Sequence, residues 1–390
     1  MPPAIAASSR LCATRSTPTW WSRSRLVLLG ACLWLLAACT DKTASPVAGP
    51  SALTSQPTLA ALPTPRSNVA VAGVHTPQGF AIIAANGLGS GKTHKAIQRS
   101  LFVWSERHPQ WRQLADLPVA EGSLASAAVA VRGRVWLLGC YTVAADGSEA
   151  STPHLHAIDP DTAVVARMPD MPIPVDDALA LPWRDRYLVL VSGWHDTGNV
   201  DAVQIFDTET QSWQSATAFP GDPVFGHAGG LVGDQLLVCD GVTAKRDANG
   251  KATFALTRDC YQGDLDPHAI GTIRWQQVTA HPGPPRYRMA ATGTGQGGGR
   301  VVFAGGSPNP YNYDGIGYDG VPSSASAQVY SYAFASGRWQ QHADTAVATM
   351  DHRGLIEYAG NFYLIGGMRD PQTVSAEVLS FRIGPFATAE

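Results

Sequence analysis

Six short apolar segments that end at or near glycine recur along the chain and constrain its fold more than any other feature. The clearest is residues 300–306, where Val, Phe and Ala lead directly into two adjacent glycines. Close or looser copies stand at residues 361–367, 134–140, 235–241, 187–193 and 80–87. Short runs of β-branched and aromatic residues bounded by turn residues are typical of buried strands. Their recurrence at intervals of about 50 to 65 residues predicts a repeat architecture.

Each apolar segment belongs to a longer unit of four predicted strands. A small-residue strand precedes it, and a variable loop, a third strand and a fourth strand follow. The fourth strands open at Trp111, Val164, Trp213, Trp275 and Trp339. In the fourth unit we expect the third strand at residues 253–259. Four short strands per unit with regular turns are typical of propeller blades, so we expect six blades.

The sixth unit stops after its third strand, which leaves one strand missing. Residues 58–63 read like residues 111–118 of the first unit, so the N-terminal strand can complete the last blade. Closure of this kind removes the open sheet edges that invite aggregation. The sequence therefore predicts an all-β, six-bladed propeller over residues 57–390, with its last blade closed by the N-terminal strand.

The glycine pair, the downstream Trp and the Asp-containing turn together resemble kelch repeats. The resemblance covers residues 57–384, with Cys140 in place of one second glycine and Val164 or Val165 in place of one Trp. It implies a kelch-type propeller. It does not imply a single activity, because one fold serves many functions.

The N-terminus has the pattern of an export signal. Residues 1–38 carry four arginines and no acid, followed by an apolar run at residues 26–38 that is too short to span a bilayer. The run ends in Leu-Ala-Ala-Cys, which resembles the lipobox of bacterial lipoproteins and implies a lipidated Cys39. An ordinary cleaved signal with an incidental Cys39 is the alternative. The resemblance implies a membrane anchor in the cell envelope, facing the periplasm, and Thr40 after the cysteine favours the outer membrane.

Residues 39–56 are rich in Ser, Thr, Pro and Ala, so we expect a disordered tether between anchor and propeller. Without the four leader arginines, 24 basic residues face 31 acidic residues, a net charge of about −7. The basic residues are scattered, which argues against a nucleic-acid partner.

Three cysteines follow Cys39, and an odd number allows at most one internal disulfide. Cys239 and Cys260 could pair if both lay in one sheet. We expect three small buried thiols instead.

Loops that enter the first strand and leave the second strand of each blade converge at one end of a propeller's channel. The entering loops contain Asp176, Asp177, His227, Arg286, Tyr287, Arg288, Asp351, His352 and Arg353. The leaving loops contain Tyr141, Trp194, Asp240, Tyr311, Tyr313, Asp314 and Tyr318. Aromatic faces beside amides, acids and arginines suit a neutral or anionic sugar. From these loops we predict a ligand site made of His227, Arg286, Arg288, Tyr311, Tyr313, Asp314, His352 and Arg353.

Two motifs that could indicate cofactors fit the repeat better. Residues 86–93 come close to a phosphate-binding loop, but Asn86 replaces its first glycine and no parallel α/β pattern follows. His154 and His156 share one strand face without an evident third metal ligand. We expect neither a cofactor nor a metal.

Six kelch units, an export signal and a long polar loop at residues 308–320 make the chain similar to the periplasmic sialic-acid mutarotases. That resemblance implies metal-free acid/base chemistry and places Asp240 and Arg246 at the catalytic positions, although Val242 stands where the family has a glutamate. We expect an exported protein that binds a small sugar-like ligand, with mutarotation as the alternative. A non-catalytic scaffold for an envelope protein is the second alternative.

Overall fold

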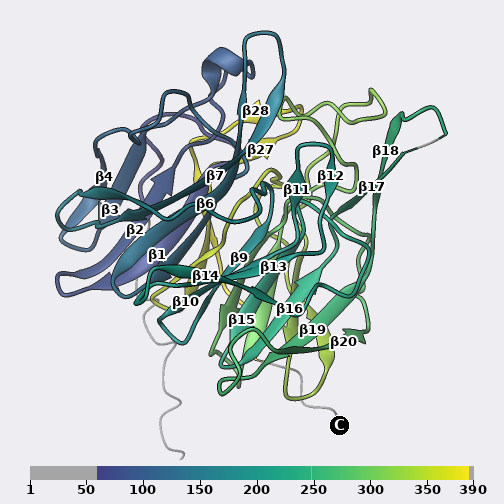
Figure 1. Ribbon diagram of the computed structural model, residues 1–390. Coiled ribbons are helices and arrows are strands. Elements are labelled where there is room, and N and C mark those ends of the chain that lie inside the picture. The colour runs from purple at the N-terminus through teal and green to yellow at the C-terminus, as the bar shows by residue number, and fades with distance from the viewer. Residues whose placement is uncertain (1–58, 247, 386–390) are drawn as a thin grey trace, which may run out of the picture. The chain divides into compact units, whose positions relative to one another are not determined.

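The computed structural model describes residues 59–246 and 248–385 of the 390-residue chain (Figure 1). These residues belong to the unit Gln56–Glu390. The predicted leader, Cys39 and the tether lie outside the described residues. Within the described ranges, no helix is long and apolar enough to cross a membrane.

Six antiparallel sheets follow one another along the described chain, one for each predicted blade. Blade 1 contains β1 (Ala70–Thr76), β2 (Gly79–Ala85), β3 (Leu101–Ser105) and β4 (His108–Gln113). Blade 2 contains β5 (Ala127–Val131), β6 (Arg134–Val143), β7 (Glu149–Ile158) and β8 (Val165–Met168). Blade 3 contains β9 (Leu179–Trp183), β10 (Tyr187–Val191), β13 (Val203–Asp207) and β14 (Ser212–Ala216).

The remaining blades continue the order. Blade 4 contains β15 (Ala228–Val232), β16 (Gln235–Cys239), β19 (Cys260–Leu265) and β20 (Ile273–Val278). Blade 5 contains β21 (Ala290–Thr294), β22 (Arg300–Ala304), β23 (Val329–Ala333) and β24 (Arg338–Gln341). Blade 6 has three described strands, β25 (Ile356–Tyr358), β26 (Asn361–Ile365) and β29 (Val378–Phe381).

Three small hairpins and one helical turn lie outside the blades. The hairpins are β11 (Trp194–His195) with β12 (Gly198–Asn199), β17 (Val242–Arg246) with β18 (Ala252–Leu256), and β27 (Met368–Arg369) with β28 (Thr373–Val374). The 3-10 turn η1 covers His94–Ala96. Figure 1 shows the β17–β18 hairpin projecting away from blade 4.

The innermost strands form a closed ring. Each contacts the next, in the order β1, β5, β9, β15, β21 and β25, and β25 returns to β1. Where their backbones approach most closely, only glycine fits. A Cβ added at Gly293 of β21 would lie 2.1 Å from the Leu231 carbonyl oxygen of β15. The predicted all-β six-bladed propeller is thus confirmed, and the small-residue strands are those nearest its axis.

Apolar clusters fill the spaces between neighbouring blades. Ile83 of β2 packs with Leu137 of β6 between blades 1 and 2, and both are almost fully buried. Ile82, on the opposite face of β2, packs with Tyr363 and Ile365 of blade 6. Because both faces of the second strand are buried, these strands read as continuous apolar runs rather than as alternating ones.

In blades 1, 3, 4 and 5, the tryptophan of the fourth strand links the blade to the segment that precedes it in the ring. In each case the indole Nε1–H donates to a backbone carbonyl: Trp213 to Pro169, Trp275 to Thr217, Trp339 to Thr279, and Trp111 to Ala60. In blade 1 the acceptor is therefore the N-terminal segment. The Leu62 N–H also donates to the Ala376 carbonyl of blade 6 (2.8 Å). The N-terminal segment therefore lies beside blade 6, which has only three described strands. Residues before 59 lie outside the described residues.

The second glycine of each pair meets a steric requirement. Gly367 has φ +92°, and a Cβ there would lie 2.8 Å from the Met350 carbonyl oxygen. A side chain would therefore collide with backbone. Blade 2 accepts Cys140 at this position because β6 continues through it as a strand.

Two sequence-based predictions for blade 4 are wrong. The third strand is β19 rather than residues 253–259, which lie mostly in the β17–β18 hairpin and the loop after it. Because β19 pairs with β16, Cys260 lies directly opposite Cys239. These two cysteines form a disulfide instead of the expected free thiols, and Cys140 remains a buried thiol.

Candidate functional site

Six equivalent residues form an inner ring where the chain enters the first strand of each blade. All have φ between +50° and +66°; they are Asn68, Ala125, Asp177, Gly226, Arg288 and Asp351. Backbone hydrogen bonds join several of them across blades, for example from Gly226 N–H to the Asp177 carbonyl (2.7 Å). This ring places three charged side chains next to the channel axis.

A buried network of ion pairs occupies the centre of the ring. Arg288 donates through Nε and Nη2 to Asp177 Oδ2 (2.9 and 2.7 Å) and through Nη1 to Asp351 Oδ1 (2.8 Å). Arg353 donates through Nη1 to Asp177 Oδ1 (2.5 Å). The Tyr287 hydroxyl donates to Asp177 Oδ2 (2.7 Å). The network therefore holds two carboxylates and two guanidinium groups.

These contacts fix the ionisation of the network. Burial alone would raise the pKa of Asp177, but Arg288 and Arg353 hold it below its ordinary value. Burial would likewise lower the pKa of Arg288, but Asp177, Tyr287 and Asp351 raise it well above its usual range. The charges of this group compensate one another, as buried charges must.

On one side of the network lies a cavity of about 340 Å³, here called the mouth cavity. Its aromatic walls are Tyr141, Trp194, Phe225, Phe254, Tyr287, Tyr311, Tyr313 and Tyr318, and its polar lining is Glu149, Asp176, Asp177, Arg288 and Asn312. Blades 2 to 5 supply these residues from loops and hairpins beyond the ring. Several of the rings contact one another, such as Phe254 and Tyr318, whose centroids are 4.0 Å apart.

Two carboxyl groups in the mouth cavity lie outside the ion-pair network. Asp176 is buried and accepts a hydrogen bond from the Ser151 hydroxyl (2.5 Å). Burial, with further repulsion from Asp177 and Glu149, raises the pKa of Asp176 well above its ordinary value. Glu149 is exposed at the start of β7, and desolvation by the cavity walls raises its pKa, while Arg288 opposes the shift. Asp176 and Asp177 are adjacent, yet their pKa values move in opposite directions.

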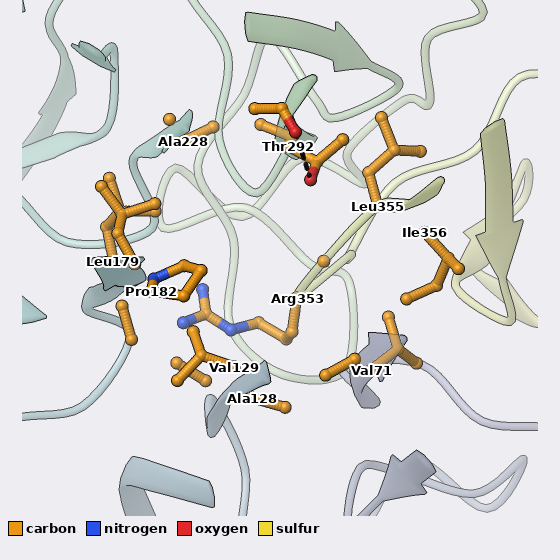
Figure 2. Close-up of a pocket in the computed structure, with 18 of the residues that line it drawn as sticks. Val71, Ala128, Val129, Leu179, Pro182, Ala228, Thr292, Arg353, Leu355 and Ile356 are labelled. Atoms are coloured by element: carbon orange, nitrogen blue, oxygen red, sulfur yellow. Dashed lines mark hydrogen bonds between the residues drawn. The ribbon is translucent and has the colours of Figure 1, made fainter. Parts of the chain in front are cut away.

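On the other side of the network lies a second cavity of about 230 Å³, here called the inner channel. Figure 2 shows the Arg353 side chain extending among small apolar side chains that include Val129, Leu179 and Pro182. Its guanidinium is fully engaged, because Nη2 also donates to the Ala178 carbonyl (2.9 Å). The inner channel thus offers mainly backbone and apolar surface.

The structure distributes the predicted ligand residues over several places. Arg288, Tyr311 and Tyr313 line the mouth cavity, whereas His227, His352 and Arg353 line the inner channel. Burial lowers the pKa of both histidines to about 4. Arg286 lies between blades and donates to Gln328 of blade 5, and Asp314 accepts the Ile316 N–H within its own loop.

The two residues placed at catalytic positions do not meet. Asp240 is buried, with Oδ2 2.8 Å from His281 Nε2, and it accepts the Arg286 N–H (2.7 Å). It therefore links blades 4 and 5. Arg246 is exposed at the end of β17 and donates to the carbonyls of Gly250 and Thr197. Neither residue lines the mouth cavity.

His154 and His156 line a third cavity of about 220 Å³ at blade 2, together with Cys140. Burial lowers the pKa of His156 to about 4. Among the described residues, no group of three or more His, Cys, Asp or Glu side chains is arranged to hold a metal ion.

Sequence reasoning did not find Glu149, Phe225 and Phe254 as cavity residues. Glu149 reaches the mouth cavity because β6 and β7 extend beyond the other strands of blade 2. Phe254 reaches it on the β17–β18 hairpin, which the sequence had suggested was part of a blade strand. The length of the segment between Cys239 and Trp275 was the available signal, since it exceeds what one loop and one strand require.

The fold and this cavity together define a six-bladed β-propeller with a small-molecule-sized pocket at one mouth of its channel. No family model and no curated protein matches the chain. Among solved structures, one titled "Structure of YjhT" is similar, with a TM-score of 0.65 and 14% sequence identity. The match covers 83% of this chain and 97% of that chain. A likeness at this identity shows the fold alone.

Proposed function

We propose that the protein binds a small sugar in the mouth cavity. The observation that carries this proposal is a cavity of about 340 Å³ that combines aromatic walls with carboxyl and amide groups. Aromatic rings pack against the apolar faces of sugars, and a few placed polar groups orient the hydroxyls. The resemblance of the sequence to sialic-acid mutarotases supports the same ligand class.

Thermal unfolding of the purified protein with a panel of free sugars tests this proposal. A sugar at a hundred times its dissociation constant adds about 2.7 kcal/mol to the free energy of unfolding. Trp194→Ala should reduce the shift, because Trp194 is a cavity wall. If no sugar shifts the unfolding of the unmodified protein, an envelope protein becomes the better candidate partner.

Mutarotation is a second candidate, favoured by the two unpaired carboxyl groups of the cavity. The raised pKa of Asp176 suits a proton donor, and the exposed Glu149 suits an acceptor. Glu149 would take the proton of the anomeric hydroxyl while Asp176 protonates the ring oxygen. The bond between the anomeric carbon and the ring oxygen then breaks, giving the open-chain carbonyl. Reclosure on the other face with reversed proton transfers gives the second anomer.

Exchange between anomers, followed by NMR on a bound sugar, separates catalysis from binding. Glu149→Gln and Asp176→Asn should slow exchange at least about a hundredfold, the usual contribution of a positioned acid or base. Asp314→Asn is the matched control, because Asp314 lies outside the cavity lining and accepts only within its loop. Exchange at the uncatalysed rate with unmodified protein would leave binding without catalysis.

The cell envelope is the proposed location, with a lipid anchor at Cys39. The basic and apolar leader supports export, and the Cys239–Cys260 disulfide is typical of oxidising compartments. Mass spectrometry of the mature N-terminal peptide tests the anchor. We expect a diacylated Cys39, and release of Cys39→Ser from the membrane; an unmodified cysteine within a shorter mature chain would contradict the anchor.

A further inference from the structure

The mouth cavity contains no positive charge that a ligand could use. Arg288 is its one basic residue among the described residues that line it. Each of its three guanidinium nitrogens donates to Asp177 or Asp351 at 2.7 to 2.9 Å, and these two carboxylates compensate its charge. Its side chain is 3% exposed. A carboxylate or phosphate on a ligand would therefore find no counter-charge here.

The same cavity contains acidic groups without cationic partners. Glu149 is exposed and takes part in none of the salt bridges of the described residues. Asp176 is bonded to the Ser151 hydroxyl rather than to a cation. The Glu149 carboxylate would repel a negatively charged ligand and attract a cation, and Asp176 adds polar oxygens but no positive charge.

The aromatic walls strengthen this preference. Trp194 and Phe254 lie with ring centroids 6.0 Å apart, and Phe254 stacks on Tyr318. The face of an aromatic ring is the negative side of its quadrupole, so it attracts an ammonium group and not an anion. Rings and carboxylates around one cavity are the two elements that recognise organic cations in water.

We propose that the mouth cavity selects sugars that carry an ammonium group and rejects sugars that carry a carboxylate. This selectivity rests on the sugar-binding function proposed above and names its substrate class. It also distinguishes this chain from the sialic-acid mutarotases it resembles, because sialic acids are anionic. The difference lies in the side chains of the cavity rather than in the fold.

Calorimetry with matched pyranoses tests the selectivity on the full protein. Glucose, galactose and mannose would each be compared as the neutral sugar, the 2-amino sugar and the uronic acid, alongside N-acetylneuraminate and choline. We expect at least one amino sugar to bind about tenfold tighter than its neutral parent, as a charge-assisted hydrogen bond provides, and its uronic acid to bind weaker. Added salt should reduce this difference.

Two substitutions at the exposed Glu149 sharpen the test without disturbing the core. Glu149→Gln should lower the affinity for the amino sugar by a larger factor than the affinity for the neutral sugar, and Glu149→Lys should favour the uronic acid. Asp314→Asn should change neither. Equal affinities across a series, or tighter binding of a uronic acid or N-acetylneuraminate, would overturn the selectivity but not sugar binding. Binding of choline without binding of any sugar would support a cation site and overturn the sugar proposal. If none of the probes bound, both sugar binding and the selectivity would be overturned.

Discussion

The mouth cavity and the inner channel lie on opposite sides of one ion-pair network and are built from the same six repeats, yet their linings differ. Strand residues line the inner channel, where close backbone approach admits mainly small and apolar side chains. Loops and hairpins line the mouth cavity, where eight aromatic and several carboxyl side chains gather. The repeated strands therefore determine the lining of the inner channel. The loops and hairpins of the mouth cavity are not constrained by the repeat and can supply functional side chains.

Arg288 binds both carboxylates of the ion-pair network, and its replacement should have the largest effect. Arg288→Met leaves Asp177 with one cation and Asp351 with none, so we expect a loss of about 3 to 5 kcal/mol in the free energy of unfolding. Denaturant unfolding of the variant and the unmodified protein measures this loss. Arg286→Met is the matched control, because Arg286 is equally buried but binds the Gln328 amide, and it should cost less. Equal losses would show that the network does not compensate its charges.

The propeller could be predicted from the sequence because its signal is repeated six times and each copy supports the others. The site could be predicted only in part, since a shift of one residue changes the side of the ring on which a side chain lies. Arg288 is at the ring, whereas His227 and His352 follow ring positions and line the inner channel. Glu149 and Phe254 depend on hairpin lengths that no repeat specifies.

The disulfide closes a segment of blade 4 that lines the mouth cavity and not the inner channel. Cys239 and Cys260 are 21 residues apart and enclose the β17–β18 hairpin that carries Phe254. Replacing both with alanine should lower the free energy of unfolding by about 3 kcal/mol and weaken sugar binding. Cys140→Ala removes a thiol without removing a cross-link and serves as control. Unfolding in the presence and absence of reductant measures the difference, and unchanged stability of the double variant would refute this role.

One substitution at each end should separate binding from stability. Trp194→Ala in the mouth cavity should weaken sugar binding about tenfold or more, as loss of a buried aromatic contact commonly does. Leu179→Ala in the inner channel should leave affinity unchanged and lower stability by about 1 to 2 kcal/mol, because Leu179 is only partly buried. Calorimetry and denaturant unfolding on both variants measure the two effects. If Leu179→Ala also weakened binding, the ion-pair network would not isolate the two cavities.

The adjacent carboxyl groups Asp176 and Asp177 allow the finest comparison. The pKa of Asp176 is raised in the folded state, so its contribution is most favourable at low pH and is lost as the pH rises through its folded pKa. The pKa of Asp177 is lowered, so its contribution is present above the ordinary value and is lost as the pH falls. Asp176→Asn should therefore raise stability at neutral pH, because the uncharged amide removes the cost of burying the ionised carboxyl group.

Asp177→Asn should lower stability under the same conditions, because it leaves Arg353 without its carboxylate and Arg288 with Asp351 alone. Unfolding free energies of both variants between pH 4 and pH 8 measure the two slopes relative to the unmodified protein. Slopes of the same sign would mean that both carboxyl groups belong to one compensated network. Opposite slopes would show that Asp176 lies outside the compensated ion-pair network, although Asp177, its neighbour in the chain, belongs to it.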